Sequence, residues 1–149
     1  MKYSREILID LPRAEVIVKM EDRSSFNYWQ RGFISYTHLS GTPGKEGSKA
    51  RILLQIRARR VDMIETILKK NLPKTSYASY ETKGVYNLQK NYFEKVLENQ
   101  TRWIVDTEFH FSGFMKIIGT LKPGIFKNQT MQYMQDFKAF AEKGKSVPN

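Results

Sequence analysis

The chain has 149 residues, which predicts one domain (residues 1–149) with its own core, and it contains no cysteine, so disulfides and thiol catalysis are excluded. The formal charge of +10 marks a basic protein that favours anions, but its lysines and arginines form no long run and no recognition-helix motif, so nucleic acid is not an expected partner. No segment approaches the roughly 20 apolar residues that span a bilayer, and no secretory signal precedes the first strand pattern. We therefore expect a cytoplasmic protein.

The N-terminal part of the sequence predicts one strand followed by two short helices. Residues 2–10 are typical of a strand, and Pro12 then suits the first turn of a helix, with Asp10 upstream as its cap. After the polar residues 22–25, Phe26 and Trp29 indicate a second short helix that ends near Gly32. These helices form a compact insertion before the remaining strands.

Six further strands are expected, joined by short turns, at residues 33–39, 50–60, 61–70, 75–82, 86–98 and 101–111. The last is the clearest, because one face collects Trp103, Val105, Thr107, Phe109 and Phe111 while the other is mostly polar. One apolar face and one wet face are typical of an antiparallel sheet that is covered on one side. Consecutive strands with short connections predict a meander.

The C-terminal part predicts a long amphipathic helix. Residues 113–121 are ambiguous but fit a short apolar helical turn that leads into it. Beyond Lys122, steps of three and four bring together Phe126, Thr130, Tyr133, Met134, Phe137, Phe140 and Ala141. A face this wide and rich in rings must pack against a sheet. The predicted fold class is α+β: a curved antiparallel sheet of about seven strands wrapped around the long C-terminal helix, with two short helices after the first strand.

This order of elements resembles the helix-grip fold of the START-related superfamily, and in particular its bacterial polyketide-cyclase-like members. The residues that carry the resemblance are the strand and helix start at 7–16, the pair Phe26 and Trp29, the middle strands at 63–67 with Pro73 and Gly84, the strand start at 101–103 and the helix end at 137–142. In that superfamily the sheet and helix enclose an apolar cavity for lipids, hormones or polyketides. The resemblance therefore implies a small hydrophobic ligand, and no cofactor is expected.

The candidate ligand-binding residues are rings of the last strand and long helix, together with neighbours on other elements: Trp29, Met63, Glu65, Tyr80, Trp103, Phe109, Phe111, Phe126, Tyr133 and Phe137. The competing interpretation is an ordinary filled core. Glu65 is the one candidate for acid or base catalysis, but both faces of its strand contain apolar residues, so alternation does not settle its direction. Tyr77 and Tyr80 lie on opposite faces, and we favour Tyr80 as the inward one.

Three functions stay open on these grounds. The leading hypothesis is a binding protein for a lipid-, isoprenoid- or polyketide-like molecule, and the second is a cyclase or dehydratase that uses Glu65. The third is an interaction module that binds an anionic partner or a membrane surface through basic residues. A metal site is not expected, because His38 and His110 are isolated. The sequence is compatible with a monomer or a homodimer.

Overall fold

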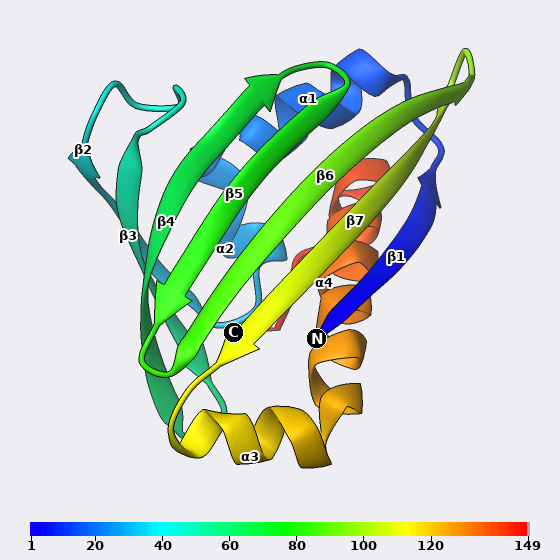
Figure 1. Cartoon of the computed structure of the whole chain (residues 1–149). Coiled ribbons are helices and arrows are strands. Elements are labelled where there is room, and N and C mark those ends of the chain that lie inside the picture. Colours follow the sequence, from blue (N-terminus) through cyan, green and yellow to red (C-terminus); the bar gives the residue numbers. More distant parts are fainter. Residues whose placement is uncertain (149) are drawn as a thin grey trace.

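The computed structural model describes residues 1–148 and contains seven strands and four α-helices (Figure 1). The strands are β1 (Lys2–Ile9), β2 (Phe33–Ser40), β3 (Lys49–Ile56), β4 (Arg59–Asn71), β5 (Thr75–Thr82), β6 (Val85–Leu97) and β7 (Gln100–Phe111). The helices are α1 (Arg13–Glu21), α2 (Phe26–Trp29), α3 (Phe114–Leu121) and α4 (Pro123–Lys143), and a short 3-10 helix, η1 (Arg23–Ser25), precedes α2. Among these described residues, no helix is both long and apolar enough to cross a membrane.

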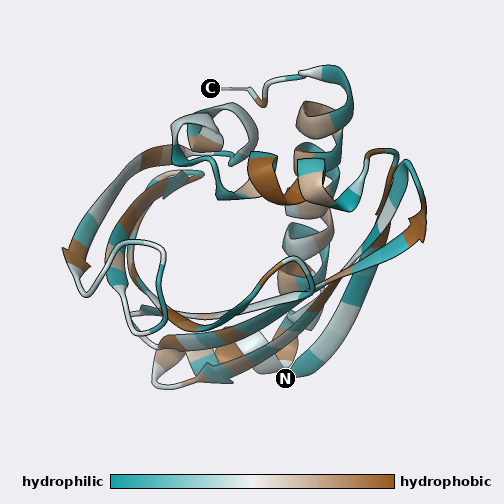
Figure 2. Ribbon diagram, turned by 90° about the horizontal axis from the view of Figure 1, so that it is seen from above, coloured by the Kyte–Doolittle hydropathy of each residue, from teal (hydrophilic) through white to brown (hydrophobic). Residues whose placement is uncertain are grey.

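All seven strands form one antiparallel sheet in the order β1-β7-β6-β5-β4-β3-β2. Strands β2 to β7 pair in sequence as a meander, and β1 returns to the far edge, where Ile7 lies opposite Trp103. The sheet curves into an arc, and the helices lie across its open side (Figure 2). The α+β helix-grip architecture expected from the sequence is confirmed.

Helix α4 lies against the concave side of the sheet, along β1 and β7 (Figure 1). Its buried residues are Met134, Asp136, Phe137 and Ala141, three of which belong to the predicted apolar face. The exception, Asp136, accepts hydrogen bonds from Arg31 Nε at 2.7 Å and from Gln132 Nε2 at 2.9 Å. A buried carboxylate needs such partners. The contact between Arg31 and Asp136 therefore links the segment after α2 to the long helix.

Two details of the sequence interpretation were wrong. The third strand was expected to reach Arg60, but the chain turns at Arg57 and Ala58, and Arg57 takes a φ of 55°. Asp10 does not cap α1: Pro12 occupies the cap position without a side-chain bond, and Asp10 instead accepts a hydrogen bond from Gln100. The ambiguous stretch before the long helix forms α3, an eight-residue helix.

Candidate ligand-binding site

The sheet register fixes which side chains face the concave side. Directly paired residues of neighbouring strands share a face, and Glu65 pairs with Tyr80, Tyr80 with Asn87, and Asn87 with Phe109. Phe109 lies on the side covered by α4, because its ring centre is 5.1 Å from that of Phe126. Glu65 and Tyr80 therefore point toward the helix.

Glu65 is the centre of a group of tyrosines from three elements. The Tyr36 hydroxyl, on β2, donates a hydrogen bond of 2.9 Å to Glu65 Oε1 on β4. Tyr80 is the direct partner of Glu65 on β5, and Tyr133, from α4, lies near enough for the Glu65 charge to raise its pKa. The Arg23 guanidinium lies over the Tyr36 ring, 4.6 Å from its centre. We call Glu65, Tyr36, Tyr80 and Tyr133 the acid–tyrosine cluster.

Burial and the charge of Glu65 raise the pKa of these tyrosine hydroxyls, so they stay protonated further into alkaline solution than an ordinary tyrosine does. Desolvation is the largest cause that raises the pKa of Tyr36, Tyr80 and Tyr133 above the ordinary value of 10.0, and the nearby Glu65 carboxylate raises each pKa further. A protonated phenol is a hydrogen-bond donor as well as an acceptor. The cluster thus combines one carboxylate with several hydrogen-bond donors.

The expected aromatic lining divides into two parts, and the first is core. Trp29, Trp103 and Phe137 are at most 1% exposed. The Phe137 ring centre lies 4.9 Å from that of Trp29 and 5.4 Å from that of Trp103. Side chains packed in this way have no surface to offer a ligand, so the C-terminal half of α4 closes on a filled core.

The second part keeps accessible surface. Met63, Phe109, Phe111, Phe126 and Tyr133 are only half buried, as are Glu65 and Tyr80. The Phe109 and Phe111 rings stack with centres 5.6 Å apart, and the centre of the Phe126 ring lies 5.0 Å from that of Phe111. Solvent therefore reaches inward-facing side chains beside the N-terminal half of α4, and we call this set with the acid–tyrosine cluster the half-buried inner face.

Sequence reasoning missed two groups of inward polar residues. Tyr36 was not singled out, although it shares a face with Ile52, its partner on β3.

On β6, Asn87, Gln89 and Asn91 all face inward, because they pair with Phe109, Thr107 and Val105. Asn91 Oδ1 accepts a hydrogen bond of 2.9 Å from Trp103 Nε1, and Asn87 Nδ2 donates one of 2.6 Å to Thr107. The equal spacing of the three amides along β6 is the signal that could have found them.

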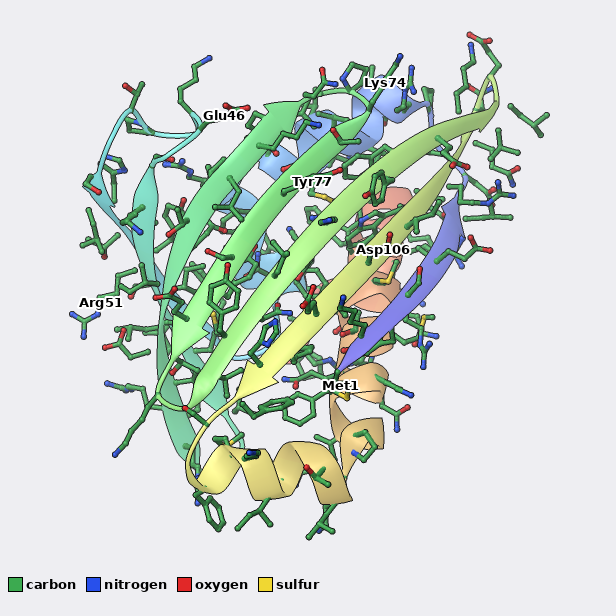
Figure 3. The ribbon with its side chains drawn as sticks, viewed as in Figure 1. Met1, Glu46, Arg51, Lys74, Tyr77 and Asp106 are labelled. Atoms are coloured by element: carbon green, nitrogen blue, oxygen red, sulfur yellow. The ribbon has the colours of Figure 1, made fainter. Side chains whose placement is uncertain are left out.

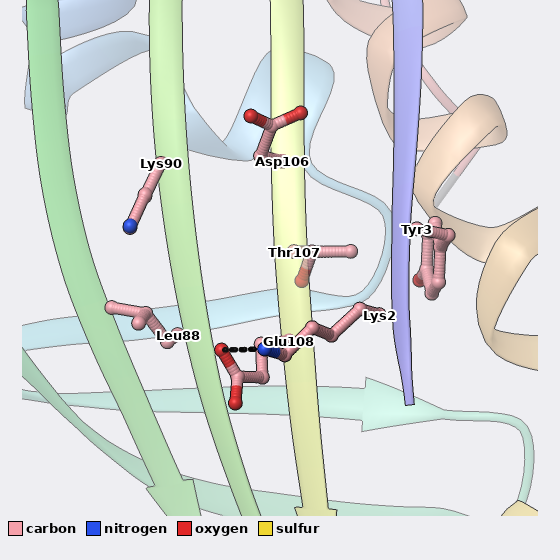
Figure 4. Close-up of a pocket in the computed structure, with 7 residues that line it drawn as sticks. All are labelled: Lys2, Tyr3, Leu88, Lys90, Asp106, Thr107 and Glu108. Atoms are coloured by element: carbon pink, nitrogen blue, oxygen red, sulfur yellow. Dashed lines mark ion pairs between the residues drawn. The ribbon is translucent and has the colours of Figure 1, made fainter.

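A shallow hollow of about 350 Å³ lies on the opposite, convex face (Figure 4). Its lining includes Leu88, Lys90 and Asp106, and Lys2 pairs with Glu108 across it at 3.9 Å. Tyr77 also lies on this face of the sheet (Figure 3), where its hydroxyl is 3.1 Å from that of Tyr92. The hollow is thus separate from the half-buried inner face.

No protein-family model matches the sequence, and no curated protein matches it. Solved structures do match. A conserved protein from Geobacillus kaustophilus has a TM-score of 0.78 at 17% identity over 97% of both chains. The ZhuI aromatase/cyclase from Streptomyces sp. R1128 has a TM-score of 0.76 at 9% identity over 99% of both chains. Norcoclaurine synthase from Thalictrum flavum, in complex with dopamine and hydroxybenzaldehyde, has a TM-score of 0.72 at 11% identity over 99% of this chain and 89% of that one. These identities establish the shared fold alone.

Proposed function

We propose that the protein binds a small hydrophobic molecule with one polar group on the half-buried inner face, between the sheet and the N-terminal half of α4. The observation that carries this proposal is a carboxylate that faces inward among rings that keep accessible surface. Carbon atoms of the ligand would cover Met63, Phe109 and Phe126. This burial would stabilise the complex by about 25 cal/mol for each Å² of apolar surface removed from water. Its polar group would meet Glu65 and the tyrosine hydroxyls.

This arrangement supports the proposed ligand class. Rings present large apolar area with few rotamers to immobilise, which suits lipid-, isoprenoid- or polyketide-like molecules. The matched structures support the same choice, since one is an aromatase/cyclase and another holds dopamine and hydroxybenzaldehyde. Glu65 restricts the choice further, because an acceptor-only carboxylate favours a ligand that can donate a hydrogen bond.

Native mass spectrometry of the gently purified protein, followed by a thermal-shift screen of fatty acids, isoprenoid alcohols and aromatic polyketides, tests the proposal. We expect a bound mass or a stabilising compound. Phe109→Ala should weaken binding of that compound at least about tenfold, whereas Tyr92→Ala, a half-buried ring on the convex face, should leave it unchanged. A protein that carries no ligand and is stabilised by none of these compounds would contradict the proposal.

A cyclase or dehydratase activity is the second candidate, and the Tyr36–Glu65 hydrogen bond favours it. A carboxylate that Tyr36 holds in place can remove a proton next to a carbonyl, while a second phenol of the cluster, Tyr133, donates to the developing oxyanion. Incubation with a reactive poly-β-ketone thioester would then give cyclised product. Glu65→Gln should reduce the rate by about 100-fold or more. If this variant turns over as fast as the unmodified protein, Glu65 has no catalytic role and binding remains the better description.

A further inference from the structure

We propose that α3, with the start of α4, docks this protein onto an anionic phospholipid surface. The inner face of α3 is fixed by two close approaches. A Cβ atom on Gly119 would lie 2.4 Å from Phe111 Cδ2, and one on Gly84 would lie 3.0 Å from Met115 Cγ. Gly119 and Met115 therefore face the end of the sheet.

The opposite face of α3 is apolar and open. Phe114 is 67% exposed, Ile117 53% and Leu121 72%, and at 100° per residue they fall within roughly 60° of one another around the helix. Ile125, in the first turn of α4, is 48% exposed. We call these four residues the α3 patch. Exposed apolar side chains that occur singly are ordinary, but three on one side of a short helix, with a fourth at the start of the next helix, indicate a contact surface.

The stretch of sequence that contains the α3 patch carries positive charge only. Between Glu108 and Asp136 the sequence has no acidic residue, and it has three lysines, Lys116, Lys122 and Lys127. Lys116 and Lys122 are exposed. Apolar side chains that enter the headgroup region, next to lysines that meet lipid phosphates, are the two parts of interfacial membrane binding. The formal charge of +10 adds a longer-range attraction to an anionic surface.

The geometry of α3 suits a helix that lies on a membrane. Its eight residues extend about 12 Å, far too short to cross a bilayer. It lies at one end of the molecule, beyond the strands (Figure 1), so a flat surface can reach it. A second copy of the chain is a less suitable partner, because a two-fold contact would bring the lysines of both copies together. The inference stands independently of the proposed ligand.

Co-sedimentation with vesicles tests this assignment. We expect the protein to sediment with vesicles that mix phosphatidylcholine and phosphatidylserine, and to stay in solution with phosphatidylcholine alone. Phe114→Ser/Leu121→Ser should lower the partition coefficient at least about tenfold. Val18→Ser/Leu97→Ser, which changes side chains that are 69% and 63% exposed elsewhere, should not.

The charge requirement has a matched pair of variants as well. Lys116→Glu/Lys122→Glu should lower binding to the mixed vesicles at least about tenfold. Lys143→Glu/Lys145→Glu makes the same charge change at the far end of α4 and should have a much smaller effect. Hydrogen exchange of the unmodified protein gives a readout without mutation, since amides of residues 114–125 should gain protection when mixed vesicles are added.

Three results would overturn the assignment. The first is equal binding to neutral and mixed vesicles, and the second is binding that Phe114→Ser/Leu121→Ser leaves unchanged. The third is a lack of vesicle binding together with a concentration-dependent dimer that this double variant dissociates, because the α3 patch would then be an interface between copies. Loss of ligand binding in the earlier experiments, with vesicle binding intact, would remove the proposed function and leave the docking surface.

Discussion

Tyr36 and Glu65 are joined by a 2.9 Å hydrogen bond across the inside of the sheet, although 29 positions separate them in sequence. The bond connects β2, an edge strand of the sheet, to β4, and β3 lies between them. It turns a carboxylate and a phenol toward the same space as Tyr80 and Tyr133. The chemistry of the inner face therefore depends on the charge that Glu65 contributes.

Glu65→Gln should lower the pKa of Tyr36, Tyr80 and Tyr133. The substitution removes the nearby negative charge, while desolvation remains and keeps each pKa above the ordinary 10.0. NMR titration of ring-labelled tyrosines would measure the shifts. Tyr92 serves as the internal control, because its hydrogen bond to Tyr77, on the convex face, is the main cause that raises its pKa to about 12. Equal shifts at Tyr92 and Tyr36 would mean that the effect is not local.

The raised tyrosine pKa values also predict a loss of stability in alkali. The folded protein keeps these phenol protons at pH values where the unfolded chain, with its ordinary pKa of 10.0, has lost them. The free energy of unfolding should therefore be independent of these groups below pH 10 and fall as the pH rises further, by up to about 1.4 kcal/mol per pH unit for each group.

Tyr80→Phe removes one of these phenols. The free energy of unfolding of this variant should therefore fall less steeply as the pH rises above 10. Urea unfolding at pH values on both sides of the tyrosine range would measure it. Below that range the variant and the unmodified protein should differ by a constant amount, whatever the cost of the lost hydroxyl. Parallel declines above it would show that Tyr80 ionises as easily in the folded state as in the unfolded one.

Alternation along the chain predicted those strands in which one face is apolar and the other polar. Trp103, Phe109 and Phe111 share a face in β7 as expected, because each second residue of a strand points the same way. The boundary near Arg57 could not be predicted in this manner. Turns are read from glycine, proline or asparagine, and here an arginine takes the positive φ of 55° that glycine usually supplies.

The candidate site was harder to predict than the fold, because it depends on register. Apolar residues occupy both faces of β4, so the direction of Glu65 became readable only from its pairing with Tyr80. The sequence could not predict which of the rings belong to the buried core and which keep accessible surface. Trp103 and Phe109 follow the same pattern in one strand, yet Trp103 is fully buried by Phe137 and neighbouring rings while Phe109 keeps accessible surface.

The ion pair between Arg31 and Asp136 should contribute far more stability than a surface pair of the same kind. Asp136 has a side chain that is only 10% exposed, so Arg31→Gln leaves a carboxylate short of partners and should cost about 2 kcal/mol. Arg51 is an equally exposed arginine, at 51%, but its partner Asp62 is 46% exposed. Arg51→Gln should leave the free energy of unfolding almost unchanged, because solvent screens this exposed pair. Urea unfolding compares the two, and equal losses would show that burial of the carboxylate has no influence.

Replacement of two glycines by alanine should have opposite effects on stability. Alanine favours a helix over glycine, and at Gly124 in α4 the added methyl group meets nothing within 4 Å, so Gly124→Ala should stabilise the protein by about 0.5 kcal/mol. At Gly119 in α3 the same methyl group would lie 2.4 Å from the Phe111 ring.

The Phe111 ring has little room to move away, because Phe109 stacks on it and the centre of the Phe126 ring lies 5.0 Å from its own. Gly119→Ala should therefore cost about 1–3 kcal/mol in urea unfolding, in spite of its better helix propensity. A variant as stable as the unmodified protein would show that α3 can move away from the sheet at no cost. In that case the close approach of Gly119 would not be what holds Phe114 and Leu121 outward, and the orientation of the α3 patch would need another cause.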